Sequence, residues 1–124
     1  MSEELVAGGA VALMGAYLRT AGDGPAAPAR DRLGRIHALI RDGVGSQGDY
    51  ARAILKDVED NPAAEDPQAA LAAVAAQQAV NDPQFRRALD EAVEEAVADD
   101  AVVELAERVA VGSGRDLLNR LRQP

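Results

Sequence analysis

Residues 54–97 read ILKDVEDNPAAEDPQAALAAVAAQQAVNDPQFRRALDEAVEEAV, a pattern typical of three helices joined by two sharp corners. The tripeptide Asp-Pro-Gln marks the start of the second and third helices, at residues 66–68 and 82–84. An aspartate can accept hydrogen bonds from the free N–H groups of a first helical turn. Proline is tolerated at the next position, because its missing N–H would be unpaired there. We therefore predict that Asp66 and Asp82 are N-caps and that each helix begins at the following proline.

The remainder of the chain shows the same helical character. Asn61 precedes a proline, and a residue in that position is disfavoured in the helical region, so a helix ends there. Asp49 is the predicted cap of this helix, and Tyr50 is expected to face the core. Apolar residues at helical spacing predict the other elements, at residues 3–20, 29–42, 67–80, 83–99 and 101–111. We therefore expect an all-α fold, a compact bundle of five to seven short helices.

Composition favours one small domain with closely packed helices. Hydrophobic residues make up 48% of the 124 residues, but alanine dominates them and aromatic residues are only 2%. Small side chains bury little area each, so the helices must approach closely. In the alanine-rich helix 67–80 we expect Leu71, Val74 and Val80 to be the large anchors. Residues 1–111 are predicted to form a single helical-bundle domain.

Residues 112–124 are predicted to hold a glycine hinge followed by a short amphipathic helix. The hinge is Gly112-Ser113-Gly114, and the three leucines on one side of the following helix are Leu117, Leu118 and Leu121. A helix this short is marginal alone in water. It is therefore expected either to dock on the body of the domain or to serve a partner.

The first predicted helix, residues 3–20, is apolar nearly all round. Such a helix is either central in the core or buried against another chain. Its apolar part, residues 5–18, is too short at 14 residues to span a bilayer. Its acidic start, Ser2-Glu3-Glu4, differs from the basic start of a secretory signal. We therefore expect a cytoplasmic protein with no membrane contact.

Charge is distributed unevenly. The net charge of −8 at pH 7 argues against nucleic-acid and anionic-membrane binding, because both need a cationic face. Residues 57–107 are strongly acidic, with only Arg86 and Arg87 as basic residues, whereas helix 29–42 is basic. These segments could pair within the chain or between chains. On helix 83–99, the carboxylates expected to project away from the apolar stripe are Glu91, Glu94 and Glu95.

Three carboxylates of the same helix, Glu91, Glu95 and Asp99, recur every four residues and so share one face. Such a row could hold a divalent cation or contact a basic partner. A solvated surface explains it more simply, since a di-metal carboxylate site would need Glu-x-x-His pairs. The chain has one histidine, His37, and the residue three positions before it is Gly34.

No other pattern predicts an active site, a cofactor site or a metal site. Gly43, Gly45 and Gly48 spell G-x-G-x-x-G, but they follow a helix, whereas a dinucleotide site needs a preceding strand. The absence of cysteine removes disulfides, thiolate metal sites and cysteine nucleophiles. Asp57, Glu59 and Asn61 mimic the opening of a calcium loop, but proline replaces its turn glycine. We therefore predict no catalytic, cofactor-binding or metal-binding residue, and no enzyme activity.

Part of the chain resembles helical modules of actinobacterial proteins. In these modules a leucine-containing helix ends in an Asn-Pro corner, an alanine-rich helix follows, and a DP-x-F/L-x-x-x-L helix closes the unit. The matching residues here are Asn61-Pro62, Leu71, Asp82-Pro83-Gln84-Phe85 and Leu89. Such modules accompany effector domains in bacterial conflict and signalling systems. The resemblance implies an adaptor role and carries no catalytic residue.

Together these observations predict a non-enzymatic adaptor or assembly module that binds protein by helix packing. The partner would be either a second copy, giving a homo-oligomer, or a heterologous protein. The alternative is an acidic inhibitor or antitoxin-like protein that covers a basic surface through the carboxylates of helix 83–99. The candidate contact residues are Leu117, Leu118, Leu121, Glu91, Glu94 and Glu95.

Overall fold

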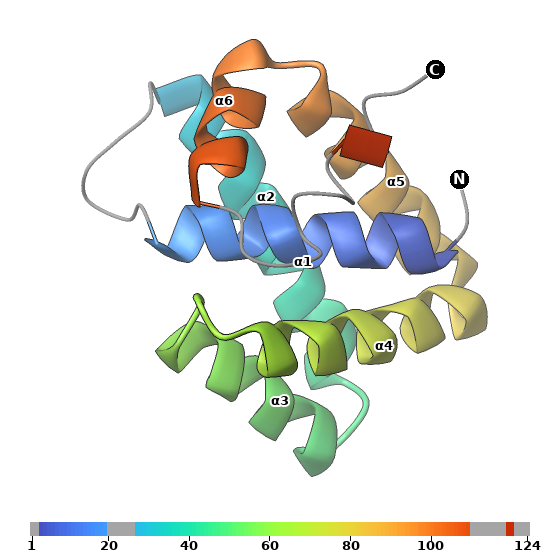
Figure 1. The fold of residues 1–124 in the computed structure, drawn as a ribbon. Coiled ribbons are helices and arrows are strands. Elements are labelled where there is room, and N and C mark those ends of the chain that lie inside the picture. The colour runs from blue at the N-terminus through green and yellow to red at the C-terminus, as the bar shows by residue number, and fades with distance from the viewer. Residues whose placement is uncertain (1–2, 20–26, 110–118, 121–124) are drawn as a thin grey trace.

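The computed structural model describes residues 3–19, 27–109 and 119–120 (Figure 1). Within these residues the chain is helical and contains no strand, so the prediction of an all-α bundle is confirmed. No helix of the described part combines the length and apolar character needed to cross a membrane. The six helices assigned in the described residues are α1 (Glu3–Arg19), α2 (Ala27–Gly45), α3 (Asp49–Asp60), α4 (Glu65–Asn81), α5 (Pro83–Val97) and α6 (Asp100–Val109).

α1 is the central helix of the bundle. It contacts all five of the other helices, and in Figure 1 it runs across the middle of the molecule with α4 below it and α6 above it. Leu13 and Met14 are fully buried, and side chains from Val6 to Ala16 share this environment. The apolar surface of α1 is therefore covered by its own chain, which selects the core interpretation over burial against a second chain.

The core is apolar throughout. Among the described residues no polar or charged residue is buried, and the largest fully buried side chains include Leu33, Ile36, Ile40, Leu71 and Leu89. Alanines fill the space between them, notably Ala10 on α1 with Ala75 and Ala79 on α4. The charged side chains of this part of the molecule are therefore exposed or only partly buried.

The two Asp-Pro-Gln corners are built differently. At the second corner Asp82 Oδ1 accepts hydrogen bonds from the N–H groups of Gln84 (3.0 Å) and Phe85 (3.3 Å), which confirms Asp82 as an N-cap. The assignment of Asp66 as an N-cap was wrong, since α4 begins at Glu65 and Ala64 is its N-cap residue, without a side-chain hydrogen bond. Proline is still tolerated two residues later, because the first four N–H groups of a helix have no partner within it. This corner is closed by the Gln68 side chain, whose amide donates to the carbonyl of Pro62.

α2 continues to Gly45, beyond the predicted end at Asp42. Gly43 lies within this helix, and the Phe85 ring of α5 packs directly against it. A Cβ atom on Gly43 would lie 2.5 Å from Cδ1 of that ring and 3.1 Å from Cζ. The break comes at Gly48, whose φ of 122° is a conformation that favours glycine. Asp49 is then the first residue of α3, not its cap as predicted, and it pairs with Arg52 at 2.7 Å.

Two large apolar side chains predicted to be inside are exposed. Tyr50 is 78% exposed and Val80 is 62% exposed, whereas Leu71 is buried as expected. Val80 follows Leu71 by nine residues, which is two and a half turns at 3.6 residues per turn, so the two point in opposite directions. Tyr50 lies beside Ala51, which takes the buried position at the start of α3.

Candidate functional site at the junction of α2, α5 and α6

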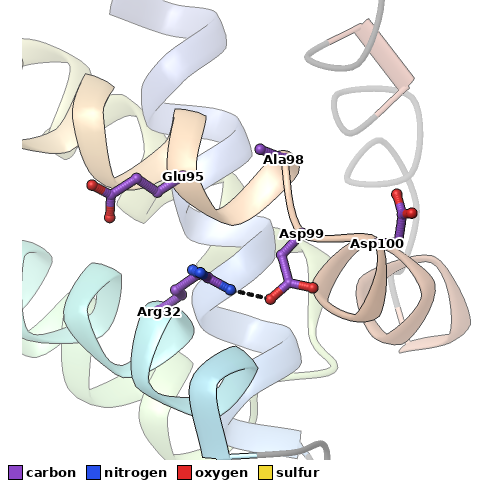
Figure 2. A pocket seen from close by; sticks show the side chains of 5 residues that line it. All are labelled: Arg32, Glu95, Ala98, Asp99 and Asp100. Carbon is purple, nitrogen blue, oxygen red and sulfur yellow. Dashed lines mark hydrogen bonds and ion pairs between the residues drawn. The ribbon is translucent and has the colours of Figure 1, made fainter.

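The basic face of α2 meets the acidic side of α5 and the α5–α6 turn. Arg32 forms an ion pair with Asp99, and Arg35 Nη1 lies 3.0 Å from Glu95 Oε2 (the first pair is drawn in Figure 2). The charge pattern allowed pairing either within the chain or between chains, and these contacts are pairs within the chain. Glu95 and Asp99, two members of the predicted carboxylate row, thus face arginines of α2.

Asp99 serves two helices at once. α5 ends at Val97, slightly earlier than predicted, and Asp99 lies in the turn before α6. Its Oδ1 accepts a hydrogen bond from the N–H of Ala101 at 3.0 Å, while its Oδ2 pairs with Arg32. Its backbone carbonyl accepts from the N–H of Val103 at 3.1 Å. One side chain therefore caps α6 and attaches the start of this helix to α2.

These residues line a surface hollow of about 420 Å³, whose walls are Arg32 on one side and the end of α5 with the α5–α6 turn on the other (Figure 2). The remaining lining residues are Glu95, Ala98 and Asp100. The hollow holds carboxylates and a guanidinium but no hydroxyl, imidazole or amine side chain. No group of three or more potential metal ligands occurs in the described residues. Its chemistry suits recognition of a charged side chain.

The carboxylates proposed for partner contact differ in their surroundings. Glu91 and Glu94 are exposed on the outward side of α5, and neither forms an ion pair with another described residue. Glu95 is engaged with Arg35, although both side chains remain about half exposed, at 58% and 45%. The three leucines predicted to bind a partner and the preceding glycine hinge lie outside the described residues.

His37 occupies a separate cluster, where α1, α2 and α3 meet. Its Nε2 lies 2.8 Å from Glu59 Oε2, and its ring lies 5.7 Å from the ring of Tyr17. Arg41 Nε is 3.6 Å from the same carboxylate oxygen. The cluster joins three helices, so the contacts of His37 are contacts between helices. Glu59 was considered as part of a calcium-loop mimic, and its position in α3 gives it this structural contact.

The sequence alone did not identify the partners of these side chains. Arg32 and Asp99 are 67 residues apart, and His37 and Glu59 are 22 residues apart. The one usable signal was the concentration of arginines on helix 29–42 opposite an acidic middle segment, which predicts pairing without saying which residues pair.

No family model matches the chain, and neither a curated protein nor a solved structure matches it. The function is therefore argued from the geometry of the surface.

Proposed function

We propose that the chain is a non-enzymatic protein–protein interaction module. The observation that carries this proposal is the separation of chemistry in the described part, where every buried residue is apolar and the charged side chains are exposed or only partly buried. Acid–base catalysis usually relies on titratable groups whose environment is partly shielded from water. A charged, open surface is better suited to recognition. The resemblance to actinobacterial modules extends this proposal to a cytoplasmic adaptor in a bacterial defence or signalling system.

The structure narrows the ways in which such a module could assemble. The apolar residues of α1 are buried in the core, so they are not available for an interface with another molecule. Self-association would then use the leucines at positions 117, 118 and 121, which the sequence places on one side of a short helix. Recognition of a heterologous basic protein would use Glu91 and Glu94, which carry charge without a described partner. The second route is the inhibitor or antitoxin-like alternative, and the exposed carboxylates of α5 favour it.

Self-association is tested by light scattering on the full chain over a wide range of concentrations. Replacing Leu117, Leu118 and Leu121 together by alanine should lower the association constant while far-ultraviolet circular dichroism stays nearly unchanged. Tyr50→Ala combined with Val80→Ala is the matched control, since it removes exposed apolar side chains from α3 and α4. Loss of the folded state in the triple variant would place the leucines in the core. A wild-type monomer at every concentration would exclude assembly through them.

Recognition of a basic partner is tested with a synthetic arginine-rich helical peptide and isothermal titration calorimetry. Glu91→Gln with Glu94→Gln should weaken binding more than Asp57→Asn with Asp60→Asn, which removes the same charge from exposed positions of α3. Arg35→Gln should strengthen binding, because it releases Glu95 from its contact within the chain. Binding should also weaken steeply with salt, because screening reduces attraction between exposed charges. Equal losses in both double variants would show that only net charge matters and would reject α5 as the contact face.

A further inference from the structure

α6 is the shortest helix of the described bundle. It has 10 residues, the fewest of the six helices, and it contacts α1, α2 and α5 but neither α3 nor α4. Its apolar contribution to the core comes from the buried side chains Val102, Val103, Leu105 and Ala106. A helix of this length has little stability of its own in water, so it depends on these contacts to remain folded.

A polar contact holds the beginning of this helix in place. Asp99 uses one carboxylate oxygen to cap α6 and the other to pair with Arg32 of α2. The Arg32 side chain is 41% exposed and that of Asp99 is 20% exposed, and both line the open hollow. The pair is thus reachable by salt ions and by charged groups of another molecule. Figure 2 shows the guanidinium and the carboxylate meeting across this hollow, with α2 on one side and the turn on the other.

We propose that α6 is a lid that opens before the rest of the bundle, and that the Arg32–Asp99 pair is the latch that sets how often it opens. Segments of a folded protein open locally with free energies that can be well below that of global unfolding, and a short helix held in part by an exposed ion pair is expected at the lower end of this range. Opening would uncover the apolar side of α6, including Val102 and Leu105, together with the surfaces of α1, α2 and α5 beneath it. This inference concerns the fold alone and does not depend on the proposed function.

The chain offers variants that separate the two tasks of Asp99. Asp99→Asn removes the charge but keeps a side chain that is an equally good N-cap. Arg32→Gln removes the same ion pair from the other side and leaves the cap intact. Arg41→Gln is the matched control, because it removes another arginine of α2 whose carboxylate partner, Glu59, lies on α3.

The experiment is amide hydrogen exchange of the full chain, followed by nuclear magnetic resonance under conditions in which reclosing is faster than exchange. In the wild type, amides of residues 103–107 should exchange faster than those of residues 10–14 in α1. Arg32→Gln and Asp99→Asn should each raise the α6 rates about 1.4- to 5-fold, the range for a partly exposed ion pair. Combining them should give no further increase, since both remove one interaction. Adding salt should raise the wild-type α6 rates but leave those of the double variant unchanged.

The readout at α1 distinguishes a lid from general destabilisation. The rates at residues 10–14 should not change in these variants, and Arg41→Gln should leave the α6 rates at the wild-type level. Equal exchange of α6 and α1 in the wild type would show that α6 opens only with the whole fold. Equal effects of Arg32→Gln and Arg41→Gln on α6 would show that the Arg32–Asp99 pair is no latch. Either result would overturn the proposal.

Discussion

Gly43→Ala is the substitution that tests the packing of α2 against α5 most directly. At an open helical position, replacing glycine by alanine stabilises a protein by up to about 1 kcal/mol, because alanine loses less conformational freedom on folding. Gly43 is not open. The added Cβ atom would lie 2.5 Å from Cδ1 of the Phe85 ring and closer still to Cε1. Real Cβ atoms essentially never lie within 3.0 Å of such a neighbour.

The ring has little room in which to retreat. Phe85 is only 7% exposed, and moving it fully into water would forgo about 1.5–3 kcal/mol of hydrophobic stabilisation. Shifting α5 instead would disturb the neighbouring core, and overpacking of this kind typically costs about 1–3 kcal/mol. Because the gain in helix propensity is smaller, we expect Gly43→Ala to destabilise the fold by about 1–2 kcal/mol. For a chain of this size that corresponds to a melting temperature lower by roughly 4–8 °C.

Urea unfolding followed by circular dichroism measures this change, and Gly45→Ala is its control. Gly45 belongs to the same last turn of α2, but a Cβ there would meet nothing within 4 Å, so that variant should be neutral or slightly stabilised. Phe85→Leu should relieve the clash, and the double variant with Gly43→Ala should lose less stability than the sum of the single losses. If Gly43→Ala instead stabilises the protein as much as Gly45→Ala does, the ring does not pack on α2 as described, and the reasoning fails.

Two pairs of variants test helix capping and burial. Asp82→Ala should cost about 0.5–2 kcal/mol, because it leaves the N–H groups of the first turn of α5 without their acceptor. Asp66→Ala removes no cap and should lose only its interaction with the helix dipole, about 0.3–1 kcal/mol, a difference that denaturant midpoints of the two variants would show. Leu13→Ala should cost about 2–5 kcal/mol, since this side chain is fully buried in the central helix. Tyr50→Ala should stay within about 0.5 kcal/mol of the wild type in thermal unfolding, because its side chain is 78% exposed.

Features controlled by neighbours in the sequence were predictable. The helix end at Asn61 follows from the proline after it, and the cap at Asp82 follows from its side chain and the proline at the first helical position. The all-α class rests on many such local signals that agree with one another. A repeated motif was still not a sufficient guide. Asp66-Pro67-Gln68 is the same tripeptide, but it begins one residue after the start of its helix at Glu65.

Features controlled by distant residues were not predictable. Glycine is common just past the end of a helix, and nothing near Gly43 shows that a ring 42 residues further along the chain packs against it. The alanine-rich composition of α4 caused a different failure. When small apolar residues lie on every face, periodicity does not define an inner side, so the position of Val80 depended on which face met α1 and α3.

Contacts between distant residues also determine which carboxylates of α5 are available to a partner. From sequence, Glu91, Glu94 and Glu95 form one group of surface carboxylates, but Arg35 partly neutralises the third of them. An exposed ion pair contributes about 0.2–1 kcal/mol, so a basic partner can displace Arg35 at little cost once it has engaged the other two carboxylates. The acids that pair with α2 are engaged within the chain, whereas Glu91 and Glu94 are the ones available to the proposed partner. The apolar residues of α1 are enclosed by their own chain, so they do not support the proposed interaction. The exposed charge on the outward side of α5 supports it instead.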